Sequence, residues 1–161
     1  MHVREATPGD AEAVRRVADA AWHDAHDDIV GPDSVERFLA EYYSIDDLRK
    51  RFAADDGTTF VASVDGTIVG YASGVPEDDW YTLGSIYVHP DWQGDGVGSA
   101  LLERVERAGA AAGFETLRLV VMADNEDSIG FYESRGFVRV ADHYDEMLDV
   151  DGYVYQKPLA Q

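Results

Sequence analysis

Cysteine is absent from the 161 residues of this chain, and lysine occurs only at Lys50 and Lys157. The lack of cysteine excludes disulfide bonds, thiolate metal sites and a cysteine nucleophile, and it fits a cytoplasmic protein. No apolar run approaches the ~18 residues that a membrane-spanning helix needs. The first five residues carry neither the basic nor the apolar region of a secretory signal. We therefore expect a cytoplasmic chain with no membrane segment.

Positive charge is also scarce, because 13 Lys and Arg stand against 32 Asp and Glu, for a net charge of −19. Without a basic patch to neutralise phosphates, nucleic acid is not an expected partner. A hydrophobic fraction of 45% argues against a disordered acidic chain. Two explanations of the acidity remain. The surface could attract cationic amines, or the protein could come from a halophilic organism, whose salt screens repulsion to within ~3 Å at 1 M. The scarcity of lysine favours the halophilic explanation.

Periodicity and turn signals predict one domain over residues 1–161. Thr7-Pro8-Gly9-Asp10 has the cap, proline and acid of a helix start, and Asp65-Gly66 has the turn signal of a hairpin. Helices are expected over residues 7–25, 33–43, 45–54, 99–113 and 125–135. Strands are expected over residues 3–6, 60–64, 67–73, 83–88, 116–122, 137–141 and 152–157. This order predicts an α/β fold with a mixed sheet packed by helices on both faces.

A glycine-rich loop joins the strand that ends at Val88 to the helix expected from Ser99. Glycine occupies alternate positions, at Gly94, Gly96 and Gly98. Glycines let a backbone approach phosphate oxygens, and the N–H groups of a helix start attract the anion. A Walker A loop would need a lysine after the last glycine, and a dinucleotide fingerprint would need different spacing. The loop thus indicates another kind of pyrophosphate site, or a connection that binds no ligand.

Two segments, in this order and at this separation, resemble the GNAT superfamily of N-acetyltransferases. Residues 93–98 read QGDGVG and fit the family's coenzyme loop, [Q/R]xxGx[G/A]. Residues 125–137 read NEDSIGFYESRGF and resemble its later segment, an Asn, a Tyr on a short helix and then Gly-Phe. Residues 3–10 also look like the family's opening strand and helix. The resemblance implies a mostly antiparallel sheet in a GNAT-like acyl-CoA N-acyltransferase fold, with acetyl-CoA as co-substrate and no metal.

The resemblance also implies how the coenzyme is held. Backbone groups of the strand before the loop would bind the pantetheine arm, and the loop would bind the pyrophosphate. Asn125 would bond the pantetheine amides, or else only cap its own helix. Asp95 departs from the Lys or Arg that the family often has and places negative charge beside the pyrophosphate. The implied coenzyme-binding residues are Ile86, Tyr87, Val88, Gln93, Gly94, Asp95, Gly96, Val97, Gly98, Ser99, Asn125 and Ser128.

Tyr132 is the implied general acid. A phenol with a pKa of ~10 stays protonated at neutral pH and can protonate a departing thiolate with a pKa of ~8.5. The alternative is that Tyr132 is a core aromatic residue. The general base is less clear, because many relatives have a Glu where this chain has Thr82. The acids Glu77, Asp78 and Asp79 and the histidines His26 and His143 are alternatives, although such histidines lie more often on the surface.

The sequence thus predicts an enzyme that transfers acetyl from acetyl-CoA to a primary amine by direct attack. The acceptor could be a small amine, an amino acid or a protein N-terminus. Trp22, Tyr42, Tyr43, Trp80 and Tyr81 are expected to line its groove, with core packing the stronger expectation for Trp22. The alternatives are an acyl-CoA-binding regulatory module, which the absence of an acid at Thr82 favours, and an interaction scaffold without a ligand. A homodimer is compatible with the sequence, and neither a membrane nor nucleic acid is an expected partner.

Overall fold

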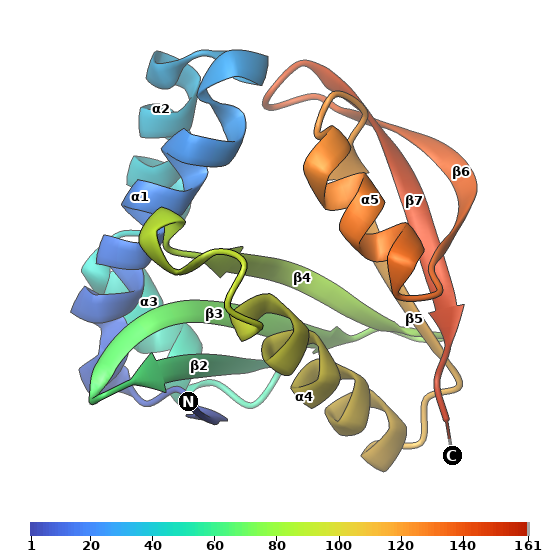
Figure 1. Cartoon of the computed structure of the whole chain (residues 1–161), viewed down its shortest axis with the longest axis horizontal. Coiled ribbons are helices and arrows are strands. Elements are labelled where there is room, and N and C mark those ends of the chain that lie inside the picture. The colour runs from blue at the N-terminus through green and yellow to red at the C-terminus, as the bar shows by residue number, and fades with distance from the viewer. Residues whose placement is uncertain (161) are drawn as a thin grey trace.

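One sheet of seven strands, in the order β1-β2-β3-β4-β5-β7-β6, forms the centre of the computed structural model, which describes residues 1–160 (Figure 1). All neighbouring strands are antiparallel except β4 and β5, which are parallel. The mixed, mostly antiparallel sheet is therefore confirmed. The strands are β1 (His2–Glu5), β2 (Thr58–Val64), β3 (Thr67–Pro76), β4 (Tyr81–Val88), β5 (Thr116–Met122), β6 (Val138–Asp145) and β7 (Val150–Pro158).

Helices cover both faces of the sheet, as expected. They are α1 (Ala11–Val30), α2 (Pro32–Tyr42), α3 (Ile45–Ala53), α4 (Val97–Ala111) and α5 (Glu126–Ser134), with short 3-10 turns η1 (Pro8–Asp10) and η2 (Pro90–Trp92). Successive side chains of a strand point to opposite faces. On β2, Val61 therefore packs in the core under α1–α3, whereas Phe60 and Ala62 pack in the core under α4 and α5. No helix within residues 1–160 is long and apolar enough to cross a membrane.

The helix start predicted at Thr7 forms as the 3-10 turn η1, and α1 itself begins at Ala11 and ends at Val30, five residues beyond its expected end. The backbone N–H of Thr7 donates to the carboxylate of Asp10 at 2.8 Å. Arg4, on β1, donates to both oxygens of the same carboxylate at 2.8 and 3.0 Å. This paired contact connects the first strand to the beginning of η1 and α1.

The feature that positions the site is the separation of β4 from β5. The two strands pair only at Tyr81–Leu117 and Thr82–Arg118. In the pairing of β4 with β3, Gly84 is an extra residue, because Ser85 pairs with Ser73 and Leu83 with Gly74. Such a bulge bends a strand and increases its twist. Figure 1 shows α1 and α2 on one side of β4, and α5 with the β6–β7 hairpin on the other.

Candidate active site

The glycine loop turns the chain so that the N-terminus of α4 is exposed. Gly94 and Gly96 have left-handed φ angles of +86° and +85°, which side chains disfavour. Gly96 is the N-cap, and α4 begins at Val97, two residues earlier than expected, so that Gly98 lies in its first turn. The first N–H groups of a helix have no partner within the helix. The loop therefore presents backbone donors that can bind an anion.

A cavity of about 670 Å³ lies between this loop, β4, α1 and α5. Most of the residues expected to bind a coenzyme line it, namely Ile86, Tyr87, Val88, Gln93, Gly94, Gly96, Gly98, Ser99, Asn125 and Ser128. Asp95 and Val97 are outside its lining. Val97 is 1% exposed and packs in the core, and Asp95 is exposed in the turn before α4. The part that these two residues play in binding a coenzyme through the backbone of the loop stays a prediction.

Polar contacts fix several side chains around this cavity. Gln93 donates to the Val88 carbonyl at 3.3 Å and to Asp24 at 3.4 Å. Asn125 accepts a bond from the Ser128 backbone at 3.2 Å, so it caps α5 while also lining the cavity. Arg135 donates to the hydroxyl of Ser99 and supplies a cation. Sequence reasoning missed Arg135, although it lies inside the segment NEDSIGFYESRGF.

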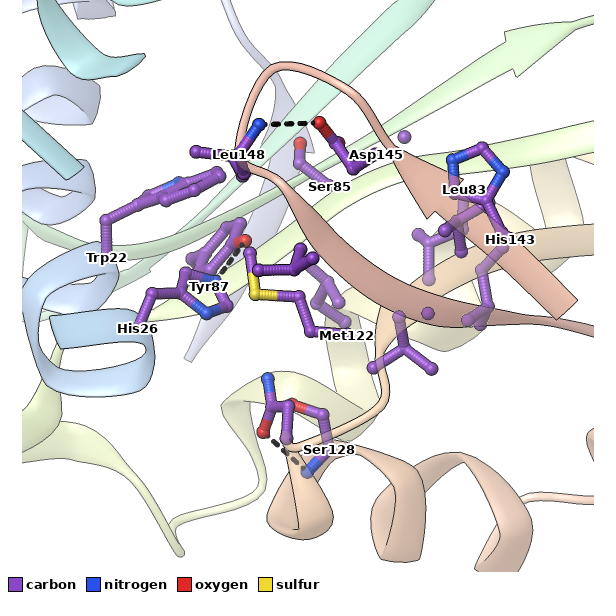
Figure 2. Close-up of a pocket in the computed structure, with 18 of the residues that line it drawn as sticks. Trp22, His26, Leu83, Ser85, Tyr87, Met122, Ser128, His143, Asp145 and Leu148 are labelled. Carbon is purple, nitrogen blue, oxygen red and sulfur yellow. Dashed lines mark hydrogen bonds between the residues drawn. The ribbon is translucent and has the colours of Figure 1, made fainter. Parts of the chain in front are cut away.

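A second cavity, of about 280 Å³, lies between α1, α2 and the β6–β7 hairpin (Figure 2). One wall is aromatic. Trp22 stacks on Phe38 at 4.3 Å and on Tyr87 at 5.0 Å between ring centroids, and Tyr43 joins them. The hairpin contributes Asp145 and Asp151. The lining of this cavity includes neither arginine nor lysine, so its local charge is negative.

The two cavities share a wall. Five residues line both, namely Ile86, Tyr87, Asn125, Ser128 and Tyr132. Tyr132 is 8% exposed. Burial raises the pKa of its phenol well above the ordinary value, so Tyr132 remains protonated throughout the neutral range. A proton donor therefore lies where the two cavities meet.

Several expected groove residues lie elsewhere. Tyr81 and Trp80 are at the closed end of the β4–β5 gap, where Tyr81 packs against Phe114 and Trp80 lies under Arg118. Tyr42 is exposed and lines neither cavity. The prediction was wrong for these three residues. Trp22 and Tyr43 line the smaller cavity, and Trp22 is also buried at 6% exposure.

Of the candidates for the general base, the histidines line a cavity and the acids do not. Glu77, Asp78 and Asp79 belong to the turn between β3 and β4 and line neither cavity. His26 and His143 both line the smaller cavity. His143 is exposed, but His26 is only 3% exposed, which corrects its expected place on the surface. Burial lowers the pKa of His26 to about 4, so its imidazole is neutral at pH 7 and is a weak base.

Residues 19–137 match the sequence model of the acetyltransferase (GNAT) family. An acetyltransferase of Yersinia pestis (strain Pestoides F) is 36% identical over 87 residues, which are 54% of this chain and 62% of the relative. An acetyltransferase of Pectobacterium atrosepticum is 34% identical over the same shares. The chain thus matches less than two thirds of the length of these curated relatives.

Solved structures agree on the fold. PaiA N-acetyltransferase from Thermoplasma acidophilum, in complex with coenzyme A, aligns with a TM-score of 0.88 at 22% identity over 98% of each chain. The ribosomal-protein-S18-alanine N-acetyltransferase of Escherichia coli aligns with a TM-score of 0.72 at 23% identity, over 99% of this chain and 94% of that one. The family model covers most of the sequence, and the fold is the same. This chain belongs to the GNAT family of acetyltransferases.

Proposed function

We propose that this protein transfers the acetyl group of acetyl-CoA to a primary amine. The larger cavity would hold acetyl-CoA, and the smaller one the amine. The observation that carries the proposal is the shared wall, because the donor and acceptor of a direct transfer must meet at one place. The complex of the similar Thermoplasma protein with coenzyme A supports the assignment of the donor.

The larger cavity suits coenzyme A in two ways. The loop from Gly94 to Gly98 and the start of α4 offer backbone N–H groups to the pyrophosphate, and Arg135 adds positive charge. Beyond Thr82, β4 has no β5 partner, so its edge is free for the amides of the extended pantetheine arm. Backbone groups are rigid, which makes them good devices for orienting a thioester.

The smaller cavity suits an amine with an apolar body. Trp22, Phe38, Tyr43 and Tyr87 offer ring faces, which attract ammonium groups and pack on carbon chains. Asp145 and Asp151 add negative charge at the hairpin. We therefore infer that the acceptor enters past these carboxylates as a cation.

The proposed reaction needs no covalent intermediate on the enzyme. The deprotonated amine nitrogen bonds to the thioester carbonyl carbon, and the carbonyl π pair moves onto oxygen. That pair then re-forms the double bond as the carbon–sulfur bond breaks, and sulfur leaves with the bonding pair. Tyr132 protonates the sulfur and regains a proton from water. The protons of the ammonium leave through water at the acidic hairpin, so the products are an N-acetyl amine, free thiol and one released proton.

The test is a panel of primary amines assayed for release of free thiol from acetyl-CoA, at high and low salt. Amines that carry a second positive charge or an aromatic body are expected to be the better acceptors. If acetyl-CoA binds and no amine releases thiol, the regulatory module is the better description. If acetyl-CoA neither binds nor raises the melting temperature, the chain is a scaffold and the proposal fails.

Calorimetry on Gly96→Val tests the coenzyme site separately. The added side chain would block the approach of the pyrophosphate, and we expect binding of acetyl-CoA to weaken at least tenfold, about 1.4 kcal/mol. Gly66→Val is the matched control, because Gly66 has a similar φ of +82° in the β2–β3 turn, outside both cavities. An unchanged affinity in folded Gly96→Val would contradict the assignment of the loop.

A further inference from the structure

His26 on α1 and Tyr87 on β4 form a hydrogen-bonded pair in the wall of the smaller cavity (Figure 2). His26 is buried and Tyr87 is half-buried, and of the two only Tyr87 also lines the larger cavity. The Nε2 of His26 is 3.0 Å from the hydroxyl oxygen of Tyr87. The Nδ1 of His26 is buried and has no hydrogen-bond partner among residues 1–160. One ring nitrogen is thus satisfied and the other is not.

This asymmetry indicates which nitrogen carries the proton. A buried N–H without a partner is rarer in proteins than an acceptor without one. The favoured tautomer is therefore the one in which Nδ1 is bare and Nε2–H donates to Tyr87. The imidazole stays neutral in this arrangement, because burial lowers its pKa to about 4. His26 is then a hydrogen-bond donor to Tyr87 and not a proton acceptor for the amine.

Tyr87 is held firmly, and its own proton is left free. Its ring stacks on Trp22 at 5.0 Å and lies 5.7 Å from the ring of Tyr71. Burial raises the pKa of Tyr87 well above its usual value, and the neighbouring Tyr43 and Tyr132 add to the shift. The phenol is therefore protonated. Because its oxygen accepts from His26, its O–H can donate to another group, and Tyr87 lines both cavities.

We propose that the Tyr87 hydroxyl donates a hydrogen bond to the carbonyl oxygen of the acetyl group, and that His26 is a positioning residue that orients this hydroxyl. This inference rests on the proposed function. As the amine nitrogen bonds to the carbonyl carbon, the π pair moves to oxygen, and the hydroxyl stabilises the negative charge without transferring its proton. The pair returns when the carbon–sulfur bond breaks. A chain from Nε2–H through O–H to the oxyanion strengthens each bond in it.

Nitrogen NMR of the protein labelled with 15N-histidine tests the tautomer without any substrate. One histidine should show a protonated Nε2 and a bare Nδ1, remain neutral well below pH 6, and disappear from the spectrum of His26→Gln. A protonated Nδ1 with a bare Nε2 would overturn the proposal, because Tyr87 would then direct its proton at His26.

Kinetics test the role. Removing one such donor typically costs ~10²–10³-fold in kcat, so Tyr87→Phe should lower kcat at least tenfold with little change in the KM for acetyl-CoA. His26→Leu should lower kcat in the parent but not in the Tyr87→Phe background. His26→Gln should recover part of the loss, because its amide N–H can donate. Melting curves establish whether each variant is folded. If His26→Leu does not fold, the kinetics of Tyr87→Phe alone test the role.

His23→Leu is the matched control, since His23 is on the same helix and bonds Asp27 outside both cavities. A kcat of Tyr87→Phe within twofold of the parent would refute the proposed role. So would a loss in His26→Leu that persists undiminished when Tyr87 is already Phe. If the parent acetylates no amine, the proposed function fails, whereas the nitrogen spectrum still decides the state of the pair.

Discussion

At the scale of single residues, two tyrosines lie at the wall that the two cavities share. Tyr132 comes from α5 and Tyr87 from β4, and both line both cavities. Burial raises the pKa of each phenol. A protonated phenol can transfer its proton to a thiolate or only donate a hydrogen bond to an oxyanion. In our proposals Tyr132 does the first and Tyr87 the second.

Tyr132→Phe should lower kcat by ~10²–10⁴-fold, the usual effect of losing a general acid. The affinity for acetyl-CoA should stay within twofold, because the ring and its packing remain. Because the pKa of Tyr132 is raised, loss of its proton should not reduce the activity of the parent up to about pH 10. Stopped-flow thiol release and calorimetry measure the two quantities, with Tyr144→Phe, exposed on β6, as control. A kcat near that of the parent, with chemistry rate-limiting, would exclude Tyr132 as the acid.

The sequence predicts some site residues and not others, for a physical reason. Gln93, Gly94, Gly96 and Tyr132 belong to short contiguous motifs, and all of them line the larger cavity. His26 contacts a residue 61 positions away, and Phe38 and Asp145 reach the smaller cavity from separate elements. Their places depend on which helix faces pack on the sheet, and local pattern carries little information about that.

At the scale of elements, local signals define most of the boundaries. Strand β5 covers Thr116–Met122, as its apolar run predicts, and Asp65-Gly66 forms the β2–β3 turn with both φ angles positive. Helix α4 begins earlier than expected because glycine is tolerated in a first turn, where few hydrogen bonds depend on it. The early separation of β4 from β5 has no signal in the sequence of either strand. It depends on how β4 pairs with β3 on one side and with β5 on the other.

The stability contributed by the paired contact between Arg4 and Asp10 should be sensitive to acid. The hydrogen bond from Arg4 is the main reason that the pKa of Asp10 is lowered. A lowered folded-state pKa adds stability above the unfolded value of ~3.9, and that stability is lost as the pH falls through the folded value. Asp10→Asn should therefore cost about 1–2 kcal/mol at pH 7, and its difference from the parent should shrink below pH 4.

Urea denaturation of parent and variant at pH 7, 5 and 3.5 measures this difference. Asp78→Asn is the control, because Asp78 is exposed and its replacement removes the same charge. A deficit of Asp10→Asn that is the same at all three pH values would show that the ion pair with Arg4 is not its source.

At the scale of the whole molecule, the charge of −19 is the dominant property. Asp145 and Asp151 place part of it at the proposed acceptor cavity. In our proposal this part attracts the amine. The rest is spread over a surface with only two lysines. Salt adaptation remains our prediction for that larger part. Repulsion among these negative charges destabilises the compact folded state.

Raising KCl should therefore raise the melting temperature. Like charges repel over ~30 Å at 0.01 M salt and over only ~3 Å at 1 M. Lowering the pH toward 4.3, the isoelectric point, should reproduce part of the gain by neutralising carboxylates. The melting temperature is measured by calorimetry at about 0.05 to 2 M KCl, with sorbitol at matched osmolality as control. A flat melting temperature would favour attraction of amines as the whole explanation.

The divergence of β4 and β5 also means that the proposed donor and acceptor sites are built largely from different elements. The proposed donor site uses a strand edge, a loop and the starts of two helices, all within residues 83–135 apart from α1. The proposed acceptor site adds α2 and the β6–β7 hairpin, which the donor does not touch. Mutations in α2 or in the hairpin can therefore change the acceptor while the machinery for the donor is inherited unaltered. A single ancestral scaffold built this way can diversify its substrates without giving up its chemistry.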